Sequence, residues 1–208
     1  MTALLIIDLQ NDFCPGGALA VPEGDAVVPV VNRLASARIP LVATQDWHPR
    51  DHLSFASQHQ GKDPFDSIEL DYGEQTLWPD HCVQGTSGAD FHPDFRGERA
   101  EMIVRKGFRR DIDSYSGFRE NDGQTTTGLA GYLREREIDS LVIAGLATDF
   151  CVKWSVEDAR ENGFKVTVIE DGVRGIDMNG SLDAAWRSMR EAGAHIVTAD
   201  EWLENQKT

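Results

Sequence analysis

The stretch SLVIAGLATDFCV, residues 140–152, decides how this chain is expected to fold. Its first part, Ser140–Ala144, is a short apolar and β-branched run that is typical of a buried strand. Beyond Cys151, apolar residues recur among charged ones at the spacing of an amphipathic helix: Trp154, Val156 and Ala159. The stretch therefore predicts a strand, a turn and a helix, with Cys151 in the first turn of the helix and Thr148 or Asp149 as its N-cap.

This position gives Cys151 two interpretations. Ligands of an α/β sheet bind outside the carboxyl ends of its strands, and free backbone N–H groups at a helix start favour negative charge. The free N–H groups and the helix dipole would lower the pKa of the Cys151 thiol and make it a nucleophile at a ligand-binding position. The alternative, and the commoner role for a lone cysteine, is a small buried apolar side chain.

Composition limits the classes of protein to consider. The chain has 208 residues and a formal net charge of −15, which argues against nucleic acid and anionic membranes as partners. It has three widely spaced cysteines: Cys14, Cys82 and Cys151. An odd number at such spacing argues against a disulfide framework and favours a reducing compartment. The N-terminal apolar run is too short for a signal peptide, and no run approaches membrane length. We expect a cytoplasmic protein with one domain over residues 1–208.

Apolar runs and helical periodicity alternate along the rest of the chain. Further strands are expected at Ala3–Ile7, Pro40–Thr44, Glu101–Arg105, Lys165–Ile169 and His195–Val197. Helices are expected at Asp25–Arg38, Thr127–Arg136 and Leu182–Ala192, with a helical turn at Asp200–Asn205. Residues 47–99 are expected to form a long irregular region, packed by its aromatic side chains. This alternation predicts an α/β fold with three layers, α/β/α, around a mostly parallel central sheet.

Three more reactive residues follow predicted strands. Asp8, Asp46 and Lys106 each lie at or just beyond a strand's carboxyl end, so they are expected at the same sheet edge as Cys151. Individually they could be a turn residue or a surface lysine. As a set they suit nucleophilic catalysis, in which Lys106 favours the thiolate and Asp8 takes its proton and returns it to a leaving amine.

A second group combines a carboxylate with imidazoles. Asp46 and His48 point the same way at an extended strand end, and His81 follows later in the chain. One carboxylate with two imidazoles, or three if His52 joins them, suits Zn²⁺, Fe²⁺ or Mn²⁺. Loop histidines that are simply hydrogen-bonded to carboxylates explain the spacing equally well.

Taken together, these motifs resemble the nicotinamidases, also called pyrazinamidases, of the isochorismatase-like hydrolase superfamily. The similarity covers nearly the whole chain, from Asp8 to about Gly193, and its motifs are DLQNDF (8–13), DWHP (46–49), WPDHCV (78–83), KG (106–107), DSYS (113–116) and GLATDFCV (145–152). The aspartate, lysine and cysteine indicate the superfamily, and the set Asp46, His48 and His81 narrows the resemblance to nicotinamidases.

The resemblance implies an isochorismatase-like hydrolase fold and a catalytic triad of Asp8, Lys106 and Cys151. Cys151 would attack the carboxamide of nicotinamide and form a thioester, which water hydrolyses to nicotinic acid for NAD salvage. Pyrazinamide is expected as a further substrate. A cis peptide bond between Leu146 and Ala147 would aim the N–H groups of Ala147 and Cys151 at the oxyanion.

The resemblance also implies the binding residues. Asp46, His48 and His81 would bind one divalent metal ion, for which Zn²⁺ is the first expectation and Fe²⁺ or Mn²⁺ the others, and His52 matches a position that is a direct ligand in only some members. Three aromatic side chains would enclose the flat pyridine ring: Phe13, Trp78 and Tyr115. The expected partner is the small-molecule substrate nicotinamide, and the sequence is compatible with a homo-oligomer.

Two other hypotheses stay open. A metal-free relative would cleave another amide, a ureide or an isochorismate-type ether with the same triad. A thiol sensor would use Cys151 as a redox switch without turnover.

Overall fold

Two neighbouring strands, β1 and β6, lie at the centre of the structure. The computed structural model describes residues 1–206. In it β1 (Thr2–Ile7) pairs in parallel with β6 (Ser140–Leu146), in a register that places Leu4 opposite Val142. Both strands are almost entirely apolar and buried, which fits a parallel strand covered on both faces. The stretch chosen from the sequence therefore lies in the middle of the sheet.

The six-stranded sheet has the order β5–β2–β1–β6–β7–β8, and every pairing in it is parallel. The remaining strands of this sheet are β2 (Leu41–Asp46), β5 (Met102–Lys106), β7 (Lys165–Arg174) and β8 (His195–Val197). After β1 the chain builds outward through β2 and β5, and it then returns to the other side of β1 as β6. The strand order therefore reverses between β1 and β6, which is where open α/β sheets bind their ligands.

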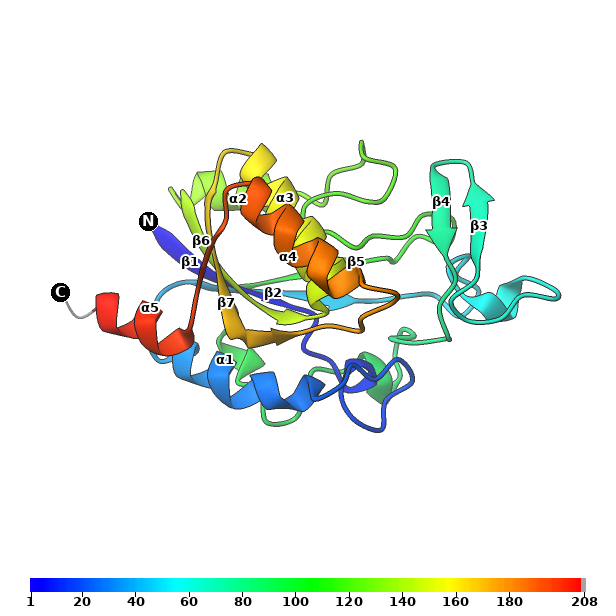
Figure 1. Ribbon diagram of the computed structural model, residues 1–208, viewed down its shortest axis with the longest axis horizontal. Coiled ribbons are helices and arrows are strands. Elements are labelled where there is room, and N and C mark those ends of the chain that lie inside the picture. Colours follow the sequence, from blue (N-terminus) through cyan, green and yellow to red (C-terminus); the bar gives the residue numbers. More distant parts are fainter. Residues whose placement is uncertain (207–208) are drawn as a thin grey trace.

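Helices cover both faces of this sheet, as Figure 1 shows. Leu4 and Ile6 face a core shared with α1 (Val27–Ala35) and α5 (Ala199–Asn205), whereas Leu5 faces the opposite core. That second core is completed by α2 (Leu129–Glu135), α3 (Lys153–Glu161) and α4 (Ser181–Glu191). The predicted three-layer α/β/α architecture is thus confirmed, because successive β1 side chains alternate between two apolar layers.

Several boundaries differ from those expected. The helix expected over Asp25–Arg38 is shorter in the structure and spans only Val27–Ala35. Residues 24–26 form a 3₁₀ turn before it, and beyond its end Arg38 has a left-handed backbone with φ of +57°. Strands β6 and β7 both continue beyond their apolar runs. The region expected to be irregular contains an antiparallel hairpin of β3 (Ser67–Leu70) and β4 (Gly73–Thr76).

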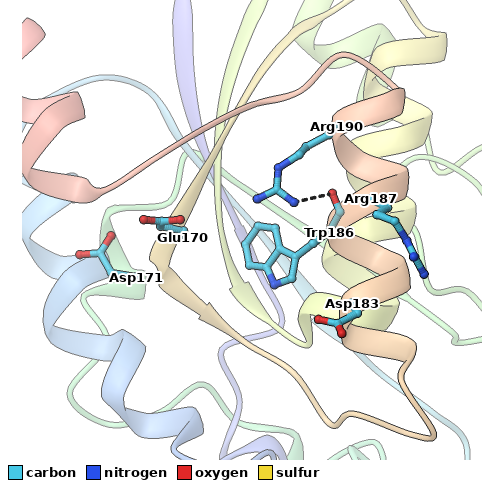
Figure 2. A pocket seen from close by; sticks show the side chains of 6 residues that line it. All are labelled: Glu170, Asp171, Asp183, Trp186, Arg187 and Arg190. Atoms are coloured by element: carbon cyan, nitrogen blue, oxygen red, sulfur yellow. Dashed lines mark hydrogen bonds between the residues drawn. The ribbon is translucent and has the colours of Figure 1, made fainter.

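A wide groove lies between β7 and α4 (Figure 2). It is lined by three carboxylates, one indole and two guanidinium groups: Glu170, Asp171, Asp183, Trp186, Arg187 and Arg190. Neither a thiol nor an imidazole lines it, so the reactive side chains singled out from the sequence must be sought elsewhere. Among the described residues, no helix is both long enough and apolar enough to span a bilayer.

Candidate active site

Lys106 lies at the centre of the reactive side chains. Its Nζ is 2.8 Å from Asp8 Oδ2 and 3.4 Å from Cys151 Sγ, and all three side chains are buried. The same Nζ lies 2.5 Å from Asp46 Oδ1 and donates a hydrogen bond of 2.9 Å to the Ser114 carbonyl oxygen. One buried ammonium therefore holds the predicted triad together and joins it to Asp46, the first residue of the predicted metal group.

The sheet brings these residues together as expected. Lys106 ends β5 and is the register partner of Asp46, which ends β2. Asp8 follows β1 directly, with φ of +44°, and its Oδ1 accepts a 2.6 Å hydrogen bond from Thr44 Oγ1 on β2. Cys151 follows β6 on the other side of β1. All four positions thus meet at the edge where the strand order reverses.

The turn that carries Cys151 differs from the one expected. Thr148–Val152 form a π-helical turn before α3, the N-cap is Ala147, and no side chain caps it. The N-cap expected at Thr148 or Asp149 is therefore wrong. The carboxylate of Asp149 instead accepts hydrogen bonds from the backbone N–H groups of Ile176 and Asp177, and from Ser181 Oγ. Asp149 braces the loop after β7 against the turn that presents the thiol. The Leu146–Ala147 peptide bond that precedes this turn is cis, as the family resemblance implied.

Burial reverses the expected effect on the thiol. Loss of solvent, followed by the charges of Asp8 and Asp46, raises the pKa of Cys151 well above its ordinary value, although Lys106 acts to lower it. The pKa of Asp8 is also raised, chiefly by burial. The pKa of Lys106 is raised well above its ordinary value because the attraction of Asp46 and Asp8 outweighs burial. At rest the site is thus a neutral thiol beside a charged ammonium, and the thiol needs a base to ionise.

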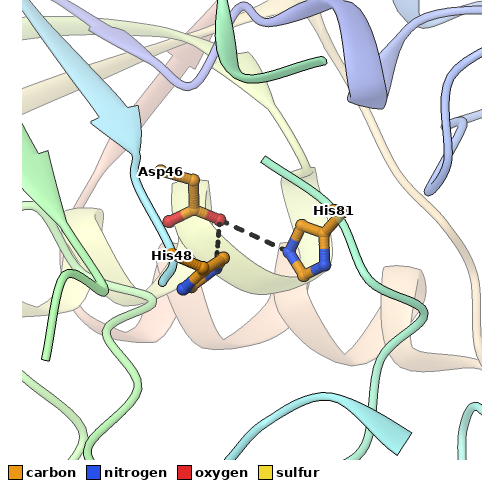
Figure 3. Close-up of side chains that lie close together, drawn as sticks. All are labelled: Asp46, His48 and His81. Carbon is orange, nitrogen blue, oxygen red and sulfur yellow. Dashed lines mark ion pairs between the residues drawn. The ribbon is translucent and has the colours of Figure 1, made fainter. Parts of the chain in front are cut away.

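Asp46 also faces two imidazole rings, as Figure 3 shows. Its Oδ2 lies 3.3 Å from His48 Nε2 and 3.6 Å from His81 Nε2, and all three side chains are buried. The other ring nitrogens, Nδ1, contact the backbone carbonyl oxygens of Gly107 and Pro79 at 2.9 and 2.8 Å. A carbonyl oxygen only accepts, so each Nδ1 carries a proton and each ring turns its Nε2 toward a carboxylate oxygen of Asp46. A cation between them satisfies all three groups, so this donor set fits a divalent metal ion.

His52 lies outside that group, and it forms a second set of possible metal ligands with His48 and Asp113, whose ligand atoms lie within 4.8 Å of one another. Its Nδ1 lies 2.7 Å from Ser54 Oγ and its Nε2 lies 3.3 Å from the carbonyl oxygen of Ile112. Its ring packs against the ring of His48, with centroids 4.4 Å apart, and burial lowers its pKa to about 4. The structure thus places a neutral His52 behind His48, where it supports the His48 ring and keeps its own nitrogens hydrogen-bonded.

A narrow pocket opens over Cys151. Asp46 and His81 line one part of it, and all three aromatic residues expected from the resemblance line other parts: Phe13, Trp78 and Tyr115. Phe150 completes an aromatic wall, with its ring edge-on to Trp78 at a centroid distance of 4.8 Å and to Tyr115 at 5.7 Å. Asp8, Lys106 and His48 are not among the lining residues and lie beneath the surface of the pocket. The pocket therefore brings the thiol, two members of the carboxylate–imidazole group and an aromatic wall together around one space.

Comparison with known proteins agrees with this arrangement. The model of the isochorismatase domain matches residues 2–201. The chain belongs to the isochorismatase family. It is 53% identical to a nicotinamidase of Acinetobacter baylyi over 95% of this chain and 92% of that protein, and 49% identical to a nicotinamidase of Escherichia coli over 98% of each.

Solved structures of the isochorismatase family extend the comparison. A structure described as an Acinetobacter baumanii nicotinamidase and pyrazinamidase superimposes with a TM-score of 0.95, at 53% identity over 97% of both chains. A pyrazinamidase of Pyrococcus horikoshii, solved in complex with zinc, superimposes with a TM-score of 0.77 at 36% identity over 95% of this chain and 98% of that one. The predicted isochorismatase-like fold is thereby confirmed.

Four residues on the wall of this isochorismatase-family pocket were not assigned from the sequence. Phe150 and Asp113 lie within two of the quoted motifs, in which Cys151 and Tyr115 were the residues assigned a role. Leu19 lies beyond the motif at 8–13, and Ile176 follows β7, which no quoted motif follows, so the motifs carried no signal for either. Only the tertiary structure brings these two apolar side chains over the thiol.

Proposed function

We propose that this protein is a nicotinamidase, which hydrolyses the carboxamide of nicotinamide to nicotinic acid and ammonia. The observation that carries the proposal is the contact chain from Cys151 Sγ through Lys106 Nζ to Asp8 Oδ2, beneath a pocket that Asp46 and His81 also line. The high identity to nicotinamidases supports the choice of substrate. Nicotinic acid is a precursor that NAD salvage consumes.

In the first half of the reaction, Asp8 accepts the thiol proton as Cys151 Sγ bonds to the carboxamide carbon. The raised pKa of Asp8 suits this transfer, because burial makes its carboxylate a stronger base than that of an exposed aspartate. Asp8 then gives the proton to the amide nitrogen, the carbon–nitrogen bond breaks, and ammonia leaves. The remaining acyl group is a thioester of Cys151.

In the second half, Asp8 takes a proton from water as the water oxygen bonds to the thioester carbon. The carbon–sulfur bond breaks, the departing thiolate of Cys151 takes the proton from Asp8, and nicotinic acid is released. The ammonium of Lys106 compensates whichever of its neighbours is negative in each step, since it contacts both Asp8 and Cys151. The backbone N–H groups of Ala147 and Cys151 are proposed to stabilise the oxyanion on the former amide oxygen.

The walls of the pocket orient the substrate. Phe13, Trp78 and Tyr115 are proposed to contact the faces and edges of the pyridine ring, because they line the same pocket as the thiol. Pyrazinamide has a ring of the same shape and is expected to bind there as well.

Asp46, His48 and His81 are proposed to hold one divalent ion, with Zn²⁺ as the first expectation. When bound, that ion supplies a Lewis acid that can coordinate the pyridine nitrogen and thereby orient the ring. This donor set argues against the alternative of a metal-free relative, because the ligand atoms of three buried side chains lie within 4.8 Å of one another. Three buried cysteines without disulfides support a reducing compartment, and we place the protein in the cytoplasm.

The test is ammonia release from nicotinamide by the purified protein, before chelation, after chelation and after Zn²⁺ is added back. We expect release that chelation lowers and Zn²⁺ restores. Release that ignores chelation would retain the thiol mechanism and reject the metal's role. No release from the metal-loaded protein would reject nicotinamide as the substrate, and ureides and carbamoyl compounds would be assayed next.

A further inference from the structure

The hairpin of β3 and β4 reaches the candidate active site through one side chain. Figure 1 shows this hairpin at the far end of the molecule from α5, apart from the six-stranded sheet. Its strand residues are exposed or half-buried with one exception, Gln75 on β4, which is 1% exposed. A glutamine is rarely buried unless its amide group is hydrogen-bonded, so its partners indicate what it does.

The amide of Gln75 contacts residues of the pocket wall. Its Nε2 lies 3.1 Å from the Tyr115 hydroxyl and 3.0 Å from Asp113 Oδ2, and both residues line the pocket over Cys151. Its Oε1 accepts a 3.0 Å hydrogen bond from the Tyr72 hydroxyl at the tip of the same hairpin. The hairpin thus presents a fixed amide to the back of the aromatic wall.

The Tyr115 hydroxyl receives a second hydrogen bond from that wall. Trp78 Nε1 donates to it at 3.2 Å, and the two rings lie edge-on at a centroid distance of 6.2 Å. Burial raises the pKa of Tyr115 well above its ordinary value, so the hydroxyl stays protonated. One oxygen atom therefore ties two pocket aromatics to the amide of Gln75. If the amide is removed, the Tyr115 hydroxyl keeps only its hydrogen bond from Trp78, and the two rings lose this polar link to the hairpin.

We propose that Gln75 is a positioning residue, which holds Tyr115, and through it Trp78, in the orientation that the substrate ring contacts. This inference rests on the proposed function, because it assigns the aromatic wall to substrate binding. Gln75 does not line the pocket and touches no reacting atom. Its effect should therefore appear in the binding of the ring and leave the chemistry at Cys151 unchanged.

The test uses Gln75→Met, which keeps the length of the side chain and removes its amide, together with Tyr115→Phe and the double variant. The control is Glu69→Met on β3, because Glu69 is exposed on the same hairpin. Loss of one net hydrogen bond is expected to raise KM for nicotinamide about fivefold in Gln75→Met, with little change in kcat. The control should match the wild type.

The double variant separates positioning from a general loss of stability. Because Gln75 acts through the Tyr115 hydroxyl, Gln75→Met should add little to the KM of Tyr115→Phe. Additive effects, or a lower unfolding temperature with an unchanged KM, would overturn the proposal. The wild-type assay keeps the two proposals apart. Absent turnover by the wild type rejects nicotinamide as substrate, whereas normal turnover with an unaltered Gln75→Met rejects the positioning role alone.

Discussion

Gly107→Ala is the substitution that tests most directly whether the metal group depends on its surroundings. Gly107 has φ of +62°, and an added Cβ would lie 2.6 Å from His48 Nδ1 and closer still to Cε1. The same residue's carbonyl oxygen lies 2.9 Å from His48 Nδ1. A methyl group here must push the ring away from the hydrogen bond that orients it, and so move Nε2 away from Asp46.

The expected magnitude has two parts. Alanine in a left-handed conformation costs about 1 kcal/mol of folding free energy wherever it occurs. Overpacking against His48 adds about 1–3 kcal/mol, which in a chain of this length corresponds to an unfolding temperature lower by about 2–12 °C. Displacement of one orienting contact is expected to weaken Zn²⁺ binding by about 10- to 100-fold.

The matched control is Gly123→Ala, because Gly123 has φ of +69° but nothing within 4 Å of an added Cβ. Thermal unfolding in chelator measures the steric part without metal, and competition with a calibrated chelator measures Zn²⁺ affinity. Gly107→Ala should be less stable and bind Zn²⁺ more weakly than Gly123→Ala. Equal values in the two variants would refute the reasoning, since the close approach to His48 would then have no consequence.

Three further variants test other parts of the site. Cys151→Ala should abolish ammonia release while thermal unfolding stays cooperative, and retained turnover would contradict a covalent mechanism. Asp8→Asn should lower kcat by about 10²- to 10⁴-fold with Zn²⁺ still bound, and a near-normal kcat would mean that another base operates. Burial raises the pKa of Glu120 more than Arg109 lowers it, so the folded state loses stability as pH rises through that pKa. The unfolding temperature of Glu120→Gln should therefore rise relative to that of the wild type as pH increases from about 4 to about 7. If the difference between the two temperatures is the same across this range, the pKa of Glu120 is not raised by folding.

The sequence predicted the strands because burial on both faces makes them continuously apolar, as in β1 and β6. The β3–β4 hairpin was missed for the opposite reason. Its strands are only four residues each, β4 has no apolar side chain, and the one buried side chain of the hairpin strands, Gln75, is polar. The site residues at strand ends could be placed because parallel strands end at one edge, whereas Leu19 and Ile176 reach the pocket from loops whose paths no local pattern encodes.

The direction of the Cys151 shift was mispredicted for a related reason. The sequence shows that a thiol lies at a helix start near a lysine, and both features favour the thiolate. It does not show that the thiol is buried, nor that Asp8 and Asp46 lie close enough to act on it. The burial of a side chain and the sum of the charges around it depend on the assembled fold. The sequence pattern therefore identified the residues of the site but could not predict their protonation states.

Lys106 explains why catalysis and metal binding have to be tested separately. Its ammonium is shared between Asp8, which we assign to proton transfer, and Asp46, which we assign to the metal group. Removing it would leave two buried carboxylates without their counter-charge, and breaking a buried ion pair in this way costs about 3–5 kcal/mol. An inactive Lys106 variant would therefore report lost structure, lost metal and lost chemistry together. Cys151→Ala removes the nucleophile and leaves every contact of Lys106 with Asp8 and Asp46 in place. The covalent step is thus better tested at the sulfur than at the residue that joins the site.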